Sequence, residues 1–393
     1  MTVERVKLAK VVEVKGGKRL PAGASFSSEP TAHPYIRGQD IRGGRIQASE
    51  QLYITETVFE KIRRYTVRGG DVCVTIVGNI GDVGVTPPEL DGANLTENAV
   101  KLIPTTSKLD SRFLAYALLS PEAQQQMKLS AAGAAQPKLG IYKVNDIEIP
   151  FPRVDSQRRI ASILAGYDDL IENNTRRIAI LEEMARRIYE EWFVRFRFPG
   201  HADVRLVESE SGLVPEGWKV RRLSDEIVLA YGKALKAEDR RPGSVPVFGS
   251  SGVVGQHDES LVAGPGIIVG RKGNVGSVHW SESPFFPIDT VYYVVTALLL
   301  DYVYFNLQRQ NFLNNDAAVP GLNRNQAYSL PLIVPDTDTL LAFARQSQAL
   351  LGLARLLAHK NENLRATRDL LLPKLISGEL DVSAMPEPEA LAA

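Results

Sequence analysis

The chain has one cysteine, no long apolar run and no excess of charge of either sign. Because Cys73 is alone, an internal disulfide and a zinc cage built from cysteines are excluded. No apolar run approaches the roughly 20 residues that a membrane-spanning helix needs. Residues 1–10 alternate charged with apolar side chains, unlike a signal peptide. We therefore expect an intracellular, cytoplasmic protein.

The balance of charge argues against a protein that simply coats nucleic acid. The 393 residues carry 46 Lys and Arg against 46 Asp and Glu, a formal net charge of zero. Residues 1–152 hold 19 basic against 16 acidic side chains, and residues 201–336 hold 12 against 15. Because binding to phosphates depends on Lys and Arg, contacts with DNA must come from local clusters or be shared with a more basic partner.

Motifs that would carry catalysis are also missing. Residues 264–266 (GPG) begin like a dinucleotide fingerprint, but Val269 stands where the third glycine belongs. Residues 270–273 (GRKG) lack the Walker pattern, and residues 86–89 (TPPE) differ at both ends from the Asp/Asn-Pro-Pro-aromatic motif of amino-methyltransferases. The five histidines show no metal-ligand spacing: they are His33, His201, His257, His279 and His359. We expect no catalytic residue, no metal site and no cofactor in this chain.

The sequence repeats itself in three blocks that keep their order. The matched blocks are residues 8–20 with 223–235, residues 77–83 with 269–275, and residues 133–152 with 316–335. Both copies of the first block end in Gly-Lys-x-Leu, and the second block is matched with Gly84 and Gly276 as its last glycines. A long helical stretch follows each third block. The repeating unit is therefore a mixed domain followed by a helix, used twice.

The two helical stretches carry apolar residues every seven positions, which predicts narrow seams of the a/d type. The first helix is expected from a cap at Asp155 to about Phe193, with two rows in its seam: Leu164, Ile171, Ile178, Ala185 and Trp192, and Ile160, Tyr167, Asn174, Leu181 and Ile188. The row in the second helix is Phe343, Leu350, Leu357, Leu364 and Leu371. Pro373 should kink or end that helix.

Two readings of these helices remain open. They could be ordinary amphipathic helices on separate cores, or they could pair with each other as an antiparallel coiled coil. Asn174 and Asn361 lie at mid-length, where a buried Asn often fixes register. A helix of roughly 38 residues spans about 57 Å, which is longer than a domain core needs. We therefore favour a spacer that closes the chain into a pseudo-twofold object.

Each domain is expected to be mixed α/β with irregular loops. In the first, we predict strands at residues 3–14, 71–77, 99–103 and 146–149 and a helix at about residues 110–129. In the second, we predict strands at residues 267–269, 290–295 and 329–334 and a helix at about residues 299–311. Glycine-rich turns between the strands would let the backbone approach a ligand closely.

Polar residues able to touch DNA cluster on these loops. Arg and Lys pair well with guanine edges and phosphates, and Asn and Gln can pair with adenine. Candidates in the first domain are Lys18, Arg19, Arg37, Gln39, Arg42, Arg45, Asn79, Gln136 and Lys138. Candidates in the second are Lys233, Lys236, Arg240, Arg241, Arg271, Lys272, Asn274, Asn323 and Arg324. Any single one of them could equally be a plain surface residue.

Several motifs resemble the specificity subunits of type I restriction-modification enzymes. They include residues 34–37 (PYIR), residues 189–194 (YEEWFV), residues 213–218 (LVPEGW) and, most specifically, residues 371–380 (LLPKLISGEL). The resemblance covers nearly all of the chain. The second domain departs from the family pattern at residues 334–336 (VPD), which lack the Gln-Arg that opens the first helix.

The resemblance implies a DNA-recognition subunit without catalysis. It implies a recognition domain at residues 1–152 and a second at residues 201–336, each of which reads one half of a split double-stranded DNA target. Spacer helices at residues 153–200 and 337–382 would set the gap, and residues 383–393 would be a disordered tail. The helices would dock two copies of an adenine methyltransferase subunit, and restriction and translocase subunits could join. S-adenosylmethionine, ATP and magnesium would belong to those partners.

Two alternatives remain open on the sequence alone. The chain could be a DNA methyltransferase or nuclease fragment with its own activity, in which case it would bind S-adenosylmethionine and transfer methyl groups without a partner. It could also be a helical scaffold whose domains bind protein and not DNA. A gel-shift measurement on random-sequence DNA, with and without a methyltransferase partner, separates the scaffold from the DNA reader.

Overall fold

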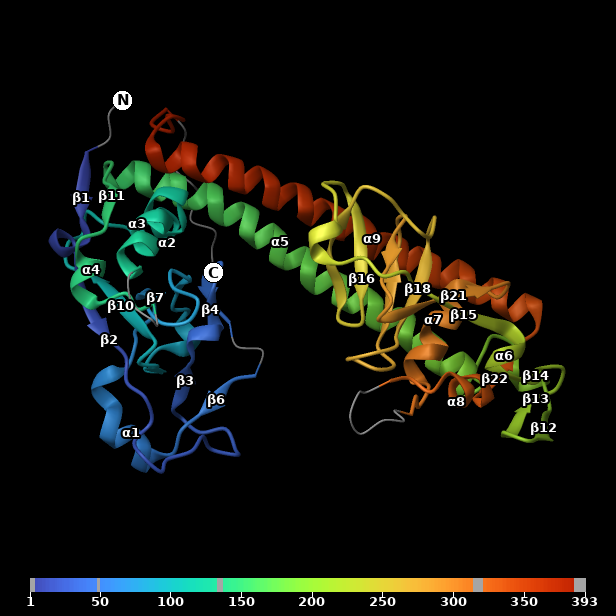
Figure 1. Cartoon of the computed structure of the whole chain (residues 1–393). Helices are drawn as coiled ribbons and strands as arrows, with labels where there is room; N and C mark the ends of the chain where they lie inside the picture. Colours follow the sequence, from blue (N-terminus) through green and yellow to red (C-terminus); the bar gives the residue numbers. More distant parts are fainter. Residues whose placement is uncertain (1–3, 48–49, 133–136, 314–320, 385–393) are drawn as a thin grey trace. The chain divides into compact units, whose positions relative to one another are not determined.

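The computed structural model describes residues 4–47, 50–132, 137–313 and 321–384. The chain forms two compact units (Figure 1). The first unit combines the residues up to Asn173 with those from Lys360 onward, and the second runs from Asn174 to His359. Two long helices, α5 (Val154–Tyr189) and α9 (Thr337–Ser377), each contribute residues to both units.

The first unit is built around a six-stranded mixed sheet. The strand order is β2 (Val12–Gly16), β10 (Ala99–Pro104), β7 (Val72–Thr75), β8 (Val83–Val85), β5 (Gly44–Ile46) and β4 (Ile41–Arg42). Adjacent strands are antiparallel, except that β5 and β8 are parallel. A smaller sheet has the order β6 (Leu52–Tyr53), β3 (Pro34–Ile36) and β9 (Asn94–Leu95). A separate pair is β1 (Arg5–Lys7) with β11 (Glu148–Pro150).

Helices cover the large sheet of the first unit. They are α2 (Ser111–Leu119), α3 (Pro121–Ala131) and α4 (Ile141–Asn145). Helix α1 (Glu56–Ile62) instead packs by the smaller sheet, since its Val58 and Ile62 share a core with Tyr35 of β3. Phe113 and Leu114 of α2 are fully buried in one core with strand β7, and burying such a side chain contributes about 1.5–3 kcal/mol. The same core includes Leu164 of α5 and Leu375 of α9. Both long helices are thus fixed to the first unit by its main core.

The second unit repeats this plan with a smaller sheet. Its antiparallel order is β15 (Ile227–Tyr231), β21 (Val291–Thr296), β18 (Gly266–Gly270) and β19 (Val278–Ser281). Further pairings are β12 (Leu206–Ser209) with β13 (Gly212–Pro215), β14 (Lys219–Arg222) with β22 (Pro331–Val334), and β16 (Val245–Gly249) with β17 (Gly252–His257) and β20 (Phe286–Pro287). Its helices are α6 (Leu223–Glu226), α7 (Leu300–Arg309) and α8 (Arg324–Ser329).

The repeat seen in the sequence is confirmed by matching strand pairings. β1 pairs with β11 as β14 pairs with β22, and β2–β10–β7–β8 has the same order as β15–β21–β18–β19. The first and third blocks keep the predicted offsets, because Leu8 N–H donates to Ile147 O and Leu223 N–H donates to Leu330 O, each at 2.9 Å. The mixed α/β class predicted for both domains is therefore confirmed.

The predicted pairing of the second block is wrong by three residues. Residues 77–83 correspond to residues 272–278 and not to residues 269–275. The turn glycines, which have positive φ in both units, are Gly78 (79°), Gly81 (93°), Gly273 (78°) and Gly276 (75°). Gly270, which the prediction placed opposite Gly78, is the last residue of strand β18 and not part of the turn. The sequence comparison matched glycines by type, whereas the fold matches them by backbone conformation.

Isolated bridges confirm this shift: they join Val77 to Lys138 and Lys272 to Gly321. Since Lys138 and Gly321 are separated by the offset of the third block, Val77 and Lys272 occupy the same place in their domains. Gly84 of β8 then corresponds to His279 of β19, and the prediction that it corresponds to Gly276 is wrong.

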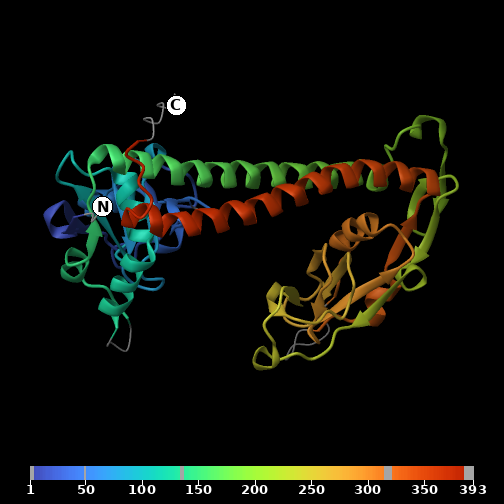
Figure 2. The same ribbon diagram turned by 90° about the horizontal axis from the view of Figure 1, so that it is seen from above.

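Within each unit α5 and α9 lie side by side and antiparallel (Figures 1 and 2). In the first unit the Nδ2 of Asn361 donates to the carbonyl of Ile171 at 3.1 Å. In the second unit the rings of Tyr189 and Phe343 pack with their centroids 6.1 Å apart. Every residue of the predicted seams is buried or half-buried, and Asn174 is only 9% exposed. The pairing of the helices is confirmed, and the reading as separate amphipathic helices is wrong.

Several predicted element boundaries need correction. The helix predicted at residues 110–129 is two helices, because Ser120 is extended ahead of Pro121 and caps α3. The strand predicted at residues 3–14 is interrupted by a 3-10 turn, and Ser329 ends α8 instead of beginning a strand. Asp155 lies inside the first turn of α5, which begins at Val154.

The end of α9 also differs from the prediction. Pro373 does not end the helix, which continues to Ser377 because Leu375 and Ile376 are buried in the first core. The helix ends at Gly378, whose φ of 77° lets it adopt a left-handed C-cap. At the other long helix, a π-helical turn (Glu190–Val194) follows α5 and carries the predicted helix past Phe193. Of the predicted disordered tail, residues 385–393 lie outside the described residues.

Candidate nucleic-acid interface

Glycine in the Gly-Lys turn fixes the end of the first strand in the large sheet of each unit. A Cβ added to Gly17 would lie 2.0 Å from the carbonyl oxygen of Thr96, and one added to Gly232 would lie 2.1 Å from that of Ile288. Both distances are too short for any side chain, so glycine is required at these positions. The glycine of the repeated Gly-Lys motif is therefore required by the close approach of the backbone, whatever the lysine contacts.

The lysine that follows each glycine is held by its own backbone. Lys18 N–H donates to the carbonyl of Leu95 at 2.8 Å, and Lys233 N–H donates to that of Pro287 at 3.1 Å. Both lysines are exposed. The Nζ of Lys18 lies 5.8 Å from the ring centroid of Tyr65. A fixed backbone with an exposed ammonium group suits contact with a phosphate or a base edge.

A second turn lies at the same end of each sheet, at residues 78–81 and 273–276. Within each turn the third residue donates its N–H to the carbonyl of the first at 2.9 Å. Asn79 and Asn274 occupy the same position in the two turns, and both are exposed. Since β2, β10 and β7 alternate in direction, the Gly-Lys turn and this second turn meet at one end of the sheet.

In the first unit these turns border a groove of about 430 Å³. The groove is lined by Gly17, Lys18, Arg19, Val77, Glu97, Asn98 and Lys138. Three of the predicted DNA-binding cations are thus brought together there. The Nε of Arg19 lies 3.9 Å from a carboxylate oxygen of Glu97, but its side chain is 79% exposed. An exposed pair of this kind contributes little energy, so Arg19 remains able to meet another anion.

Two other predicted cations of the first domain are committed to the protein itself. The guanidinium of Arg37 donates to the buried carboxylate of Asp40 at 2.8 Å. Arg45 makes ion pairs with Asp169, at 2.5 Å, and with Glu172, both on α5. These contacts hold a loop and attach β5 to the long helix. Neither arginine is placed as a free DNA contact.

The remaining candidates of the first domain are two exposed side chains and one residue that lies outside the described residues. Gln39 and Arg42 are exposed beside β4. Gln136 lies outside the described residues. Their roles stay predictions.

In the second unit an arginine–tyrosine cluster lies at the matching end of the sheet. The guanidinium carbons of Arg271 and Arg324 each lie 5.1 Å from the ring centroid of Tyr231. They lie 5.9 and 5.8 Å from the centroid of Tyr292. These distances fall within the range of cation–π attraction, so the tyrosine rings hold both guanidinium planes.

Further hydrogen bonds orient the two arginines. Arg271 Nη1 donates to the carbonyl of Asp289 at 2.7 Å, and Arg324 Nη2 donates to the hydroxyl of Tyr328 at 2.9 Å. Hydrogen bonding to Tyr292, together with Arg324, lowers the pKa of Tyr231. A guanidinium has five N–H donors, so donors remain on each arginine for a ligand. Sequence analysis named both arginines but missed the tyrosines, whose signal was their position at the strand ends beside basic residues.

The other candidates of the second domain divide into two groups. Lys272 and Asn323 belong to the same end of the sheet, and the Asn323 side chain caps α8 by accepting from the N–H groups of residues 325 and 326 at 3.1 Å. Lys236, Arg240 and Arg241 are engaged elsewhere: their partners are Glu238 for Lys236, the Val254 carbonyl for Arg240, and Asp258 and Glu259 for Arg241. Arg240 and Arg241 are thus held by the protein itself, whereas the pair of Lys236 is exposed and leaves this lysine able to meet another anion.

Within residues 4–47, 50–132, 137–313 and 321–384 no group of three or more His, Cys, Asp or Glu side chains is arranged to hold a metal ion. Burial raises the pKa of the Cys73 thiol to about 12, so this cysteine is a poor nucleophile. None of the helices in the described part of the chain could cross a membrane. What the described residues offer is two polar surfaces at corresponding sheet ends.

Comparison with known proteins identifies the family. Residues 1–183 and 215–369 match the model of the type I restriction modification DNA specificity domain. The MjaIX specificity subunit of Methanocaldococcus jannaschii is 26% identical over 179 residues, which cover 46% of this chain and only 40% of that protein. A putative MjaX specificity subunit of the same organism is 20% identical over 394 residues, covering 91% of this chain and 90% of that protein.

A solved structure shares the fold. The S subunit of a type I restriction-modification system from M. genitalium superposes with a TM-score of 0.56 at 19% identity, over 95% of this chain and 96% of that one. The family itself is shown by the matched model, which covers both copies of the repeat. This chain belongs to the type I restriction-modification DNA specificity family, as a specificity subunit.

Proposed function

We propose that each domain reads one half of a bipartite double-stranded DNA target and that the chain itself carries out no chemistry. The supporting observation is the repeated frame at the sheet ends, in which Gly17 and Gly232 anchor turns that present Lys18 and Lys233. Around this common frame the two domains display different side chains. Two similar frames with different contact groups suit two half-sites of different sequence.

The same proposal assigns the long helices two further tasks: they set the gap between the half-sites and dock the methyltransferase subunits. Support comes from their length, 36 residues for α5 and 41 for α9, and from seams that run along both. S-adenosylmethionine, ATP and magnesium would then be bound by the methyltransferase and translocase subunits. Those partners would also supply positive charge that this chain lacks.

A domain exchange tests the reader model. Residues 205–336 are replaced by the equivalent domain of a relative, and the complex with the methyltransferase is used to methylate a DNA library. We expect one half of the recognised sequence to change and the other to stay. A change in both halves would show that the domains do not read independently.

The gap model is tested by inserting one helical turn beside Asn174 in α5 and a matching turn in α9. The gap between the methylated half-sites should then change while each half-site keeps its sequence. A gap that stays fixed would rule out the helices as the spacer. The purified chain should neither bind S-adenosylmethionine nor transfer methyl groups, and either activity would favour the alternative of an enzyme.

A further inference from the structure

The two units differ in how the sheet ends beyond its fourth strand. In the first unit β5 runs parallel to β8, with Gly44 paired to Gly84 and Arg45 paired to Val85. In the second unit β19 is the counterpart of β8, and among the described residues no strand follows it. The strands β4 and β5 have no counterpart there among the described residues, because the chain turns back directly after β16 and pairs with it as β17. β17 takes the place of β6, since β17–β16–β20 has the same order as β6–β3–β9. The edge of β19 is therefore unpaired in the described part of the chain.

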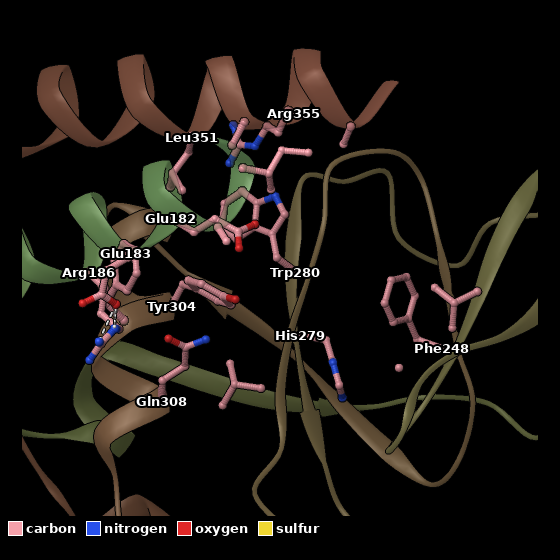
Figure 3. Close-up of a pocket in the computed structure, with 18 residues that line it drawn as sticks. Glu182, Glu183, Arg186, Phe248, His279, Trp280, Tyr304, Gln308, Leu351 and Arg355 are labelled. Carbon is pink, nitrogen blue, oxygen red and sulfur yellow. Dashed lines mark hydrogen bonds and ion pairs between the residues drawn. The ribbon is translucent and has the colours of Figure 1, made fainter. Parts of the chain in front are cut away.

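A groove of about 680 Å³ lies along this open edge, entirely within the second unit (Figure 3). Val278 and Trp280 of β19 line one side, Tyr304 of α7 lines the floor, and Leu351 of α9 and Glu182 of α5 line the helical side. It occupies the place that β5 fills in the first unit, between the fourth strand of the sheet and a long helix.

The backbone of β19 is able to accept another strand. Gly270 N–H donates to the carbonyl of Ser277 at 2.7 Å, which makes these two a hydrogen-bonded pair. Hydrogen-bonded and non-bonded pairs alternate along antiparallel strands. The N–H and C=O groups of Val278 and Trp280 consequently point away from β18, toward the open edge. Trp280 occupies the position in β19 that Val85 occupies in β8, and Val85 pairs with β5 in the first unit. The backbone N–H and C=O groups of the two residues therefore point to the same side of their sheets.

Charge at the groove also differs from the first unit. There β5 brings Arg45 to two acids of α5. The α9 residue that corresponds to Glu172 is Arg355, which pairs with Glu282 at 2.9 Å and stacks on Trp280. Glu182 also faces the groove and makes no ion pair within the described residues. Its side chain is exposed, and desolvation by neighbouring groups raises its pKa. A basic side chain in the groove would supply its missing partner.

We propose that this groove binds an extended segment of a partner polypeptide, which adds to the edge of β19 as a parallel strand and places a basic side chain beside Glu182. Addition of a strand to an open sheet edge is a common mode of peptide recognition, in which main-chain hydrogen bonds give affinity and side-chain pockets give specificity. An unprotected edge is also a liability for aggregation, so a bound segment would protect it. The proposal does not depend on DNA recognition.

The first test uses the strand that fills this place in the first unit. The probe is a fluorescein-labelled peptide of residues 41–47 (IRGGRIQ), together with the same peptide carrying Arg45→Glu, titrated with the full chain in the absence of DNA. We expect saturable binding of the parent peptide and about two- to fivefold weaker binding of the Arg45→Glu peptide. Glu182→Arg should reverse this preference. Glu210→Arg, the same charge change at an exposed turn outside the groove, should leave it unchanged.

The second test addresses the main-chain contacts. Val278→Pro removes an outward-facing N–H, a change that an edge strand tolerates, and it should abolish peptide binding while the thermal unfolding midpoint stays close to that of the parent chain. Hydrogen exchange of the amides of residues 278 and 280 should slow when the peptide is bound.

Three outcomes would overturn the proposal. The first is the absence of saturable binding of either peptide up to roughly 1 mM. The second is binding that Glu182→Arg leaves unchanged. The third is self-association of the chain that Val278→Pro abolishes, because the occupant would then be a second copy of this chain and not a different polypeptide.

Discussion

The two units share a frame and differ in what the frame carries. Both place a glycine against the backbone of the neighbouring strand, and both follow it with a lysine held by the same hydrogen bond. The first unit then presents exposed cations around a groove, whereas the second stacks Arg271 and Arg324 on tyrosines. The glycine cannot be replaced where the two backbones approach so closely. The exposed side chains near the turn can change without destabilising the fold. This separation lets one fold serve two different recognition tasks.

The units also attach to the long helices by different chemistry. In the first, Tyr116 donates to the buried Asp168 at 2.6 Å, and Arg368 pairs with the other oxygen of that carboxylate at 2.5 Å. In the second, Ser347 donates to the buried Asp301 at 3.0 Å, and Arg355 lies 3.8 Å away. The first attachment is a tight charged network, and the second is a looser one.

The largest expected effect concerns this network. Asp168→Ala removes one of the two carboxylate partners of the half-buried Arg368 and leaves the hydroxyl of Tyr116 without its acceptor, so it should destabilise the first unit by about 3 kcal/mol. Asp301→Ala should cost the second unit only about 1 kcal/mol. Denaturant unfolding followed by hydrogen exchange assigns each loss to its unit. Equal losses would show that the difference in geometry has no energetic meaning.

A smaller effect is expected at the arginine–tyrosine cluster. Arg271→Ala should weaken binding of the methyltransferase complex to its DNA target by roughly 10- to 100-fold, which corresponds to one bidentate base contact. The relaxed specificity should be confined to one half-site. Methylation of a DNA library measures both. Relaxed specificity in both half-sites, or in neither, would remove Arg271 from base reading.

The starts of the two long helices supply a test by pH. Asp336 accepts from Thr339 N–H at 2.8 Å and from the indole of Trp218 at 3.0 Å. Burial alone would raise its pKa, but these hydrogen bonds outweigh burial and leave the pKa lowered. Because the pKa of Asp336 is lower in the folded than in the unfolded chain, its carboxylate stabilises the second unit at pH values above the unfolded pKa. This contribution is lost as the pH falls through the folded pKa.

Asp336→Ala should therefore cost about 1 kcal/mol at neutral pH, as the loss of a helix cap does, and the difference from the parent chain should shrink on acidification. The first unit anchors its helix with Gln157, whose amide bridges the carbonyls of Lys108 and Pro152 and accepts from Asp110 N–H. Gln157→Leu is the uncharged control. Its effect should not depend on pH, and a pH dependence as large as that of Asp336→Ala would contradict the assignment.

The smallest effect is expected at a predicted DNA contact that takes no part in the arginine–tyrosine cluster. Lys236 makes only an exposed pair with Glu238 at 3.5 Å. Lys236→Ala should change stability by less than about 0.5 kcal/mol and leave the recognised sequence unchanged. A changed half-site would extend the interface beyond the sheet end.

Much of the fold could be predicted from periodicity alone. The seven-residue seams identified both long helices and their buried faces, because a seam consists of the apolar side chains that become buried when two helices pair. The internal repeat predicted two similar domains, because its matched blocks occur in the same order in both halves of the chain. Boundaries were predicted less well. The break at Ser120 has a local signal in the following Pro121, which the prediction overlooked, whereas the course of the helix at Pro373 required knowledge of what packs nearby. Pro373 sits inside a helix only because the residues after it are buried.

The candidate site could be predicted less well, since sequence identifies charge but not its partner. Arg37 and Arg45 looked like Lys18 in the sequence, yet each is bound to acids within the fold. Tyr231 was missed although it lies at a strand end beside a basic residue, because its role depends on two arginines that are 40 and 93 positions away in the chain. The register of the second block needed backbone angles that no residue type records.

The strand pairs β1–β11 and β14–β22 have a consequence for how such a protein changes over time. Arg5 pairs with Pro150, and Arg222 pairs with Pro331, so each domain enters and leaves its helix through neighbouring backbones. A segment with adjacent ends can be exchanged by recombination without moving the flanking helices. New target sequences could then arise in one genetic step, by transplanting a whole module between genes.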